Sequence, residues 1–241
     1  GYSQNVNWTF RSGRVTGVYG LVGSGRSETA LAAFGHLPRA GGTVRLDGTP
    51  ITPRHPREAI RLGLAYLPED RQIQGLFANK SLENNLTSNV LGHYIRNLGT
   101  LDIAGLRQLA SKIMDRYNIK APSSHAPINA LSGGNQQKGL FSRWAHMELK
   151  VLILDEPTRG IDVGTKAEIH DFVRQLAAEG AAIGVISSDL DEVLSVSDEV
   201  IVMRQGAVID RFSGENMTAE PILAAAIGGE TTEQPAASAT S

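Results

Sequence analysis

Residues 20–27 read GLVGSGRS. The run comes close to the phosphate-binding pattern G-x-x-x-x-G-K-S/T, whose backbone amides surround a polyphosphate and whose last hydroxyl binds Mg²⁺. Arg26 stands where the pattern has lysine, so the positive charge is kept on a bulkier, planar head group. The alternative is a glycine-rich turn that binds no ligand. The candidate phosphate-binding residues in and beside the run are Gly20, Gly23, Ser24, Gly25, Arg26, Ser27 and Glu28.

The segments around this glycine-rich loop support the phosphate-binding interpretation. The apolar run 15–19 predicts a strand that leads directly into the loop. After the loop, SETALAAF (27–34) predicts a helix that ends at Gly35. A phosphate loop requires this order of strand, loop and helix, and the amino end of the helix adds a partial positive charge.

Downstream, apolar segments alternate with helical segments, which predicts a mostly parallel sheet covered on both faces. The predicted strands are 64–67, 151–154, 182–186, 200–203 and 208–212, and the predicted helices are 165–178 and 189–196. Residues 41–51 alternate around Asp47-Gly48, which predicts an antiparallel hairpin. Apolar residues at helical spacing predict an inserted helical lobe over about 82–143. The predicted fold class is therefore α/β.

Composition excludes several classes of function. The 241-residue chain has no cysteine, so it forms neither disulfides nor thiolate metal sites, and its formal net charge of −2 gives no support for nucleic-acid binding. No apolar run approaches the roughly 20 residues that cross a bilayer. The chain starts abruptly in strand-like sequence, as expected of a piece of a longer polypeptide. Residues 228–241 are small and polar, which predicts a disordered tail.

A second motif, VLILDEP, occupies residues 151–157. Its apolar run ends at Asp155 and Glu156, at the carboxyl end of a predicted strand, where parallel sheets bind ligands. Asp155 can hold Mg²⁺ through water, and Glu156 can polarise an attacking water molecule. The alternative is a pair of acids that cap the following helix.

A third motif, LSGGNQQK, occupies residues 131–138. Ser132, Gly133 and Gly134 open a predicted helix and leave backbone amides exposed, which could bind phosphate. The alternative is an ordinary helix start in which Ser132 is the capping residue.

In this order, the motifs resemble the ATPase domain of ATP-binding-cassette (ABC) transporters over residues 5–227. More narrowly, GLVGSGR, LPEDR, LSGGNQQK, DEPTRGID and SSDLDEV resemble the C-terminal ATPase half of tandem ATPases that drive uptake of ribose, xylose, galactosides and autoinducer-2. The resemblance implies a P-loop NTPase core, with ATP and Mg²⁺ as cofactors. It also implies one ATPase domain over 1–227, with the helical lobe inserted in its core.

The resemblance implies a role for each matching residue. Residues 20–27 would be the Walker A loop, and residues 131–135 the signature motif with Asn135 in the usual glutamine position. Ser188 stands where the switch histidine usually sits, and Glu69 where a glutamine senses Mg²⁺ and contacts the membrane subunit. The implied residues beyond the loop are Glu156 and Ser188 for catalysis, Ser27, Glu69 and Asp155 for Mg²⁺, Ser132, Gly133, Gly134 and Asn135 for ATP, and Asp162 for the dimer interface.

These replacements predict a weak site within this chain. Ser188 is uncharged, and Arg26 differs in shape from lysine, so this site would bind ATP and hydrolyse it slowly. By resemblance, the signature motif would complete the ATP site of an N-terminal ATPase half in trans. The implied partners are that half, transmembrane permease subunits and, indirectly, a periplasmic or extracellular sugar-binding protein. The expected location is the cytoplasmic face of the cell membrane.

Two other functions are open at this point. A nucleotide-binding regulatory module would open and close with ATP but not hydrolyse it. Arg26 and Ser188 favour that module, whereas Glu156 favours an enzyme. Cassette ATPases of DNA repair and chromosome maintenance carry zinc cysteines or long coiled-coil insertions, and this chain has neither.

Overall fold

The computed structural model describes residues 6–96, 99–144 and 147–228. At its centre lies a six-stranded sheet in the order β4-β5-β6-β1-β7-β8, with β8 antiparallel to β7 and the other pairs parallel. The strands are β1 (Val15–Tyr19), β4 (Leu64–Leu67), β5 (Val151–Asp155), β6 (Ala182–Ser187), β7 (Glu199–Arg204) and β8 (Ala207–Ser213). The predicted α/β fold with a mostly parallel sheet is confirmed.

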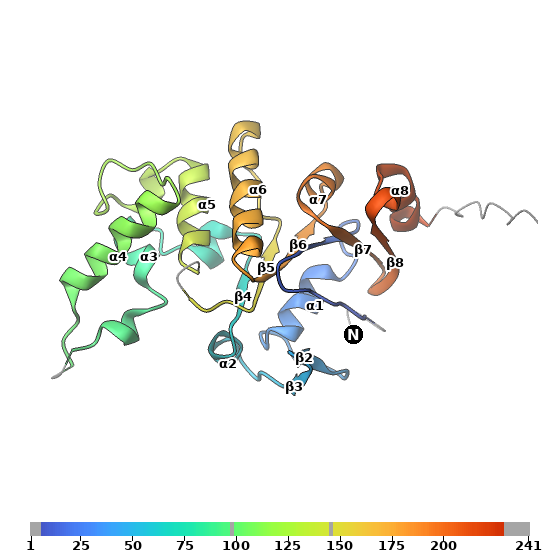
Figure 1. Cartoon of the computed structure of the whole chain (residues 1–241), viewed down its shortest axis with the longest axis horizontal. Helices are drawn as coiled ribbons and strands as arrows, with labels where there is room; N and C mark the ends of the chain where they lie inside the picture. Colours follow the sequence, from blue (N-terminus) through green and yellow to red (C-terminus); the bar gives the residue numbers. More distant parts are fainter. Residues whose placement is uncertain (1–5, 97–98, 145–146, 229–241) are drawn as a thin grey trace, which may run out of the picture.

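Helices cover both faces of this sheet (Figure 1). Side chains alternate along β1, so Val15 and Tyr19 face one way and Val18 faces the other. Val15 shares a core cluster with α6 (Val163–Ala178), and Tyr19 shares one with α7 (Leu190–Val196) and α8 (Ala219–Ile227). Val18 packs with α1 (Arg26–Ala33) on the opposite face. Because both faces of the sheet are buried there, the inner strands β5 and β6 are almost continuously apolar.

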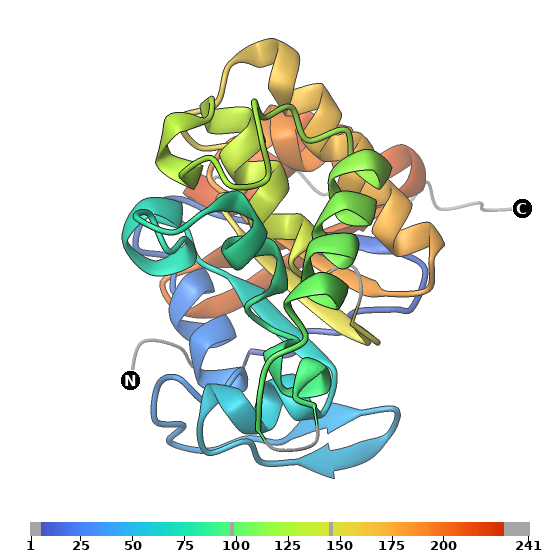
Figure 2. The same cartoon turned by 90° about the vertical axis from the view of Figure 1, so that its left-hand side faces the viewer.

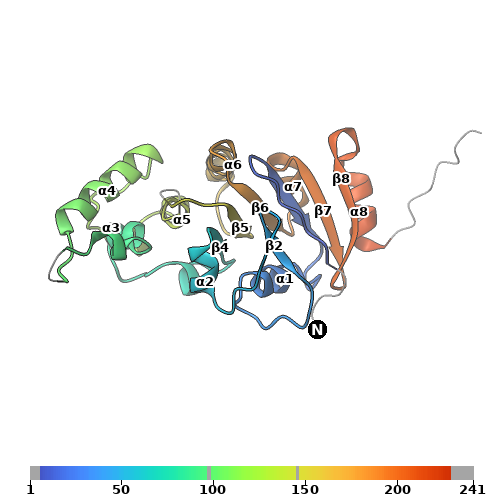
Figure 3. The same ribbon diagram turned by 60° about the horizontal axis from the view of Figure 1, so that its bottom comes forward.

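The predicted hairpin is present and consists of β2 (Val44–Leu46) and β3 (Thr49–Ile51). Asp47 and Gly48 at its turn have φ values of 50° and 76°, the left-handed conformation that a tight two-residue hairpin requires. The hairpin packs through Leu46 and Ile51 against strand β4 and helix α2 (Pro56–Arg61). Figure 1 shows this unit beside α1 and α2, and in Figure 3, where the bottom of the molecule comes forward, β2 lies in front of the sheet.

The helical lobe lies at one end of the molecule in Figure 1, and it faces the viewer in Figure 2. Its helices α3 (Leu82–Thr87), α4 (Ile103–Arg116) and α5 (Gly133–Ser142) follow β4 in the chain and precede β5. Leu82, Ile113 and Phe141 belong to the same core cluster as Ile169 of α6. The lobe is therefore joined to the sheet by continuous apolar packing.

Some sequence-based predictions concern residues outside the described ranges. The tail predicted over 228–241 lies there, apart from Gly228, which caps α8 with a left-handed backbone (φ 95°). Helix α8 is an addition to the predicted elements and packs Ile222 against β7 and β8. The domain limits 1–227 stay a prediction. In the ranges that the structure describes, no helix has the length and apolar character to cross a membrane.

A buried arginine joins the lobe to the segment that precedes it in the chain. The guanidinium of Arg143, at the end of α5, donates hydrogen bonds to the backbone oxygens of Asn85 (2.9 Å) and Gly75 (2.8 Å). It also donates to Asn85 Oδ1 (3.0 Å) and lies 5.4 Å from the ring centre of Phe77. Burial lowers the pKa of Arg143 to about 10. Its charge is therefore held by neutral oxygens and an aromatic ring.

We expect Arg143→Met to destabilise the protein strongly, because the oxygens of Gly75 and Asn85 lose a buried donor. The expected loss in free energy of unfolding is on the order of 3 kcal/mol. Urea denaturation followed by circular dichroism measures it. Arg116→Met is the matched control, since Arg116 forms an exposed ion pair with Glu179 and its loss is expected to cost less than about 1 kcal/mol. Equal effects of the two changes would contradict the structural role of Arg143.

Candidate functional site

A cavity of about 640 Å³ lies at the carboxyl ends of β1, β5 and β6. Its volume falls within the range of ordinary ligand pockets. The predicted site residues that it brings together are Gly23, Gly25, Arg26, Ser27, Glu28, Glu69, Glu156 and Ser188. The other residues that line it are Val22, Thr158, Arg159, Gly160, Ile161, Lys166, Asp189 and Glu192. Gly20, Ser24 and Asp155 are buried and do not line the cavity.

The glycine-rich loop wraps the amino end of α1. Gly25 immediately precedes the helix with φ 89°, a conformation that side chains with a Cβ rarely adopt. At Gly20 a Cβ would collide with the backbone oxygen of Met203 at the end of β7. The loop is tied down there by Gly206, whose N–H donates to the Ser24 oxygen (3.0 Å). Unpaired amides of the first turn of α1 form a site suited to anions.

Arg26 is engaged by the protein itself. Its side chain is only 7% exposed, and Nη1 donates a hydrogen bond to the backbone oxygen of Ser187 at the end of β6. Nη2 lies 3.8 Å from Glu156 Oε1. Burial lowers the pKa of Arg26, and the neighbouring carboxylate of Glu156 opposes this shift. Arg26 therefore ties the loop to the ends of β5 and β6.

Asp155 ends β5 in a buried, polar setting. The hydroxyl of Tyr66 donates to Asp155 Oδ2 (2.5 Å), and the Ser27 hydroxyl lies close to this carboxyl group. Burial raises the pKa of Asp155, although the Tyr66 and Ser27 hydroxyls oppose the shift. Asp155 Oδ1 is buried and has no hydrogen-bond partner within the described part of the chain. The motifs do not point to Tyr66, because it precedes LPEDR in β4 and lies outside every motif.

The donors around Asp155 suit Mg²⁺. Magnesium prefers oxygen ligands and usually takes one or two carboxylates, water and substrate phosphates. Ser27 and the free oxygen of Asp155 provide such donors. No cluster of three or more histidine or carboxylate side chains that could hold a metal exists among the described residues. Glu69, the third predicted ligand, lines the same cavity but forms an ion pair with Arg159.

Glu156 is held in position by the loop after β6. Its φ is 47°, uncommon for a residue with a side chain, and its N–H donates to the Ile186 oxygen (2.8 Å). The backbone N–H of Ser188 donates to Glu156 Oε1 (2.8 Å), and Ser187 Oγ lies 3.4 Å from Oε2. Burial raises the pKa of Glu156, while the Ser188 hydrogen bonds oppose the shift. These contacts fix the orientation of the Glu156 carboxylate at the cavity.

A buried polar chain continues behind Glu156. The hydroxyl of Ser187 donates to Glu192 Oε2 (2.5 Å), and Glu192 Oε1 lies 3.5 Å from His170 Nε2. Lys166 forms an ion pair of 2.9 Å with Asp189 nearby. None of these residues was predicted as part of the site. SSDLDEV contains Ser187, Asp189 and Glu192, but their contacts depend on how α6 packs against α7.

The signature residues lie apart from this cavity, at the start of α5. Ser132 is exposed, and its hydroxyl accepts hydrogen bonds from the backbone N–H (3.4 Å) and Nδ2 (2.9 Å) of Asn135. Gly133 is half-buried beside the Arg71 guanidinium. Gly134 is buried, and a Cβ there would collide with Thr165 of α6. Close packing of α5 against α6 therefore explains why position 134 is a glycine, whereas Ser132 and Gly133 are accessible to a ligand.

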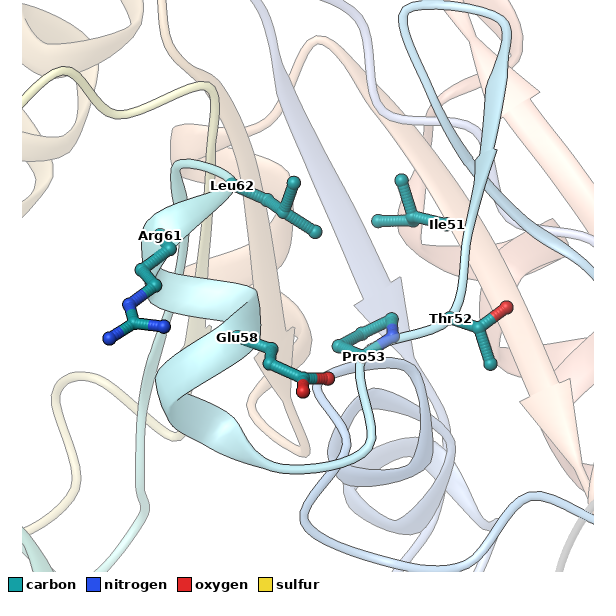
Figure 4. Close-up of a pocket in the computed structure, with 6 residues that line it drawn as sticks. All are labelled: Ile51, Thr52, Pro53, Glu58, Arg61 and Leu62. Atoms are coloured by element: carbon teal, nitrogen blue, oxygen red, sulfur yellow. The ribbon is translucent and has the colours of Figure 1, made fainter.

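A second hollow of about 320 Å³ lies between β3 and α2 (Figure 4). Ile51, Thr52, Pro53, Glu58, Arg61 and Leu62 line it. It is wide and mostly apolar, and none of the sequence motifs contributes a residue to it. The motif-bearing cavity is therefore the better candidate site, because it combines a glycine-rich loop with convergent polar groups.

The sequence model of the ABC transporter family matches residues 3–159. The ribose import ATP-binding protein of Geobacillus kaustophilus is 44% identical over 229 residues, which cover 95% of this chain and 46% of that protein. The arabinose import ATP-binding protein of Paraburkholderia xenovorans is 43% identical over 234 residues, 97% of this chain and 45% of that protein. The chain thus spans about half the length of these curated relatives.

Solved structures show the same fold. A nucleotide-free ATP-binding cassette from an ABC transporter superposes with a TM-score of 0.77 at 23% identity, covering 92% of this chain and 89% of that one. An ATP-binding cassette in its ADP conformation superposes with a TM-score of 0.75 at 22% identity, covering 92% and 91%. The family match over residues 3–159 and the 44% identity to a curated relative over 95% of the chain establish that the chain belongs to the ABC transporter family.

Proposed function

We propose that this chain is an ATP-binding and ATP-hydrolysing domain that energises import of a sugar or a sugar-like solute. The observation that carries the proposal is that Ser27 and Glu156 line one cavity beneath a glycine-rich loop, with Asp155 buried at the end of β5 beside Ser27. The sugar class is supported by similarity to relatives named for ribose and arabinose import. Because the chain covers about half of those relatives, it would act within a larger protein.

Each part of the site has a role in this proposal. The loop amides and the start of α1 bind the phosphates. Ser27 and Asp155 would hold Mg²⁺, which neutralises phosphate charge when bound. Glu156 orients the attacking water and accepts its proton, and burial favours this because it makes the carboxylate more basic. Ser188 fixes Glu156 through its backbone N–H.

We infer that turnover at this site is slow. Arg26, in the place of the phosphate-binding lysine, is occupied with the Ser187 oxygen and lies near Glu156. Ser188 is uncharged and supplies no cation to a phosphate. Loss of one preorganised donor to the transition state lowers a rate by roughly 10²–10³-fold. The second candidate function is a regulatory module that binds ATP without hydrolysing it, and Arg26 and Ser188 favour it. Glu156, whose carboxylate is held by Ser188, favours hydrolysis.

The signature motif would serve a different ATP site. Ser132 and Gly133 lie at the exposed start of α5 and do not line this chain's own cavity. They present a hydroxyl, backbone amides and a helix amino end, all suited to phosphate. We propose that they complete, in trans, the ATP site of an N-terminal ATPase half of the same polypeptide.

A surface for the membrane subunits lies on the segment after Glu69. Residues 71–75 form a π-helical turn whose start is capped by the Asp70 carboxylate. Ile73 is 82% exposed and Phe77 54% exposed on this segment. We propose that these apolar side chains dock on transmembrane permease subunits at the cytoplasmic face of the membrane, with a periplasmic or extracellular sugar-binding protein as an indirect partner.

The chain is expected to bind ADP and ATP with Mg²⁺, weakly, because the Arg26 side chain is already engaged. Titration calorimetry on the 241-residue chain measures this. Gly25→Asp should abolish binding, since it places a carboxylate among the phosphates and strains a left-handed position. Gly41→Asp is the control, because that glycine lies in open space. A flat titration of the unchanged chain at millimolar nucleotide would contradict the proposal.

A substitution in the signature motif is expected to lower ATP turnover more than a substitution in the chain's own ATP site. In the complete tandem protein, Gly133→Asp should remove nearly all ATP turnover, because it places a negative charge where the partner's phosphate approaches. Glu156→Gln should leave substantial turnover. Steady-state phosphate release compares the two. Gly134→Asp is unsuitable, since its side chain would strike Thr165. If Glu156→Gln loses ATP turnover while Gly133→Asp keeps it, hydrolysis takes place at this chain's own site and the proposed role in trans is wrong.

A cysteine at Ile73 is expected to crosslink to a cytoplasmic permease loop in the assembled transporter. The chain has no cysteine, so the introduced thiol is unique within it. A cysteine at Ile209, an exposed apolar residue on β8, is the matched control. Crosslinks from Ile209 and none from Ile73 would place the docking surface elsewhere.

A further inference from the structure

The cavity that binds nucleotide in the proposed function has an unfavourable charge for a polyanion. Five carboxylates line it, at Glu28, Glu69, Glu156, Asp189 and Glu192. Three cationic side chains face them, at Arg26, Arg159 and Lys166. A polyphosphate therefore needs a cation that can leave its present partner at low cost.

The three cations differ in how firmly they are held. Arg26 is buried and bonded to the Ser187 oxygen. Lys166 Nζ is 2.9 Å from Asp189 Oδ2, and Asp189 is itself fixed as the capping residue of α7. Arg159 is ion-paired with Glu69, and both side chains are exposed, at 67% and 42%. Exposed ion pairs contribute little free energy, so Arg159 is the cation most easily released.

The backbone of Arg159 is fixed close to the reacting end of the cavity. Its N–H donates to the Glu156 oxygen (3.1 Å), and its own oxygen accepts from Nη1 of Arg71 (3.0 Å). The side chain therefore starts from a rigid turn directly after Glu156 while its guanidinium remains solvent-exposed. This combination suits a group that changes partner without moving the chain.

We propose that Arg159 is the phosphate-binding cation of this cavity and that Glu69 holds it when no nucleotide is bound. This inference rests on the proposed nucleotide-binding function. When nucleotide binds, the guanidinium exchanges the Glu69 carboxylate for phosphate oxygens, which its planar fork can contact in pairs. Arg159 thereby supplies a positive charge to the phosphates. Arg26 cannot supply it because its guanidinium is bonded to the Ser187 oxygen, and Ser188 has no charge. Glu69 competes with the nucleotide for the same guanidinium.

This exchange predicts opposite effects at the two positions. Arg159→Gln should weaken ADP binding about tenfold, the scale of one charge-assisted hydrogen bond to phosphate. Glu69→Gln should strengthen ADP binding, because Arg159 is then free beforehand. In the double variant the gain from Glu69→Gln should vanish. Adenosine, which has no phosphate, should bind all variants equally.

Displacement of a fluorescent ADP analogue from the 241-residue chain measures these affinities. EDTA is present throughout, so that loss of a metal ligand at position 69 does not contribute. Arg159→Lys keeps the charge and should retain most of the affinity, which separates loss of the cation from misfolding. Lys150→Gln is the control, since it removes a cation from a remote exposed ion pair with Asp47.

Several results would overturn the assignment. One is unchanged ADP binding in Arg159→Gln. Another is a gain from Glu69→Gln that persists in the double variant, because Glu69 would then repel the nucleotide directly and would not act by holding Arg159. Equal weakening for ADP and adenosine would indicate a structural role. If the unchanged chain fails to bind ADP, the proposed function falls and this inference falls with it.

Discussion

The parallel register of three strands is the constraint on which the candidate site depends. Tyr19 pairs with Ser187, and Asp155 pairs with Ile186, so β1, β6 and β5 end side by side. The glycine-rich loop, Glu156 and Ser188 each follow one of these ends. Residues more than 130 positions apart in the chain therefore meet because the strands pair in this register. A slip of one residue in any pairing would turn the side chains of that strand to the opposite face.

The electrostatics of the cavity follow from this convergence. Burial raises the pKa of Asp155 and Glu156 and lowers the pKa of Arg26, so each ionised group costs free energy there. Close contact between Arg26 and Glu156 offsets part of that cost. The site is thus stable without a ligand, and this stability opposes nucleotide binding. The arginine in the loop favours the arrangement in which the site's charged groups pair with each other, because its guanidinium bonds to the Ser187 oxygen of β6.

Sequence patterns could predict the strands and the motif-bearing helices, because apolar runs and capping residues act locally. They did not predict α2, a short six-residue helix without a full amphipathic repeat, or α8, which packs on the last two strands. The motifs gave roles to Asp155 and Glu156 but none to Arg159, which lies inside DEPTRGID, or to Tyr66, which lies outside every motif. Those two residues join the site through contacts whose geometry depends on the packed sheet and on side-chain conformation. The ion pair between Glu69 and Arg159 also depends on how the chain packs, so no local sequence pattern predicts it.

The packing of Gly134 against Thr165 has a consequence for how this domain changes in evolution. The two residues come from the start of α5 and from the first turn of α6, and there is no space between them for another carbon atom. A larger residue at one position is compatible with the fold only if the other shrinks or α5 shifts. Thr165 is further restrained because its hydroxyl bonds to the Asp162 side chain that caps α6. A chimaera that exchanges the helical lobe must therefore keep compatible residues at positions 134 and 165, because a side chain larger than glycine at 134 would strike Thr165.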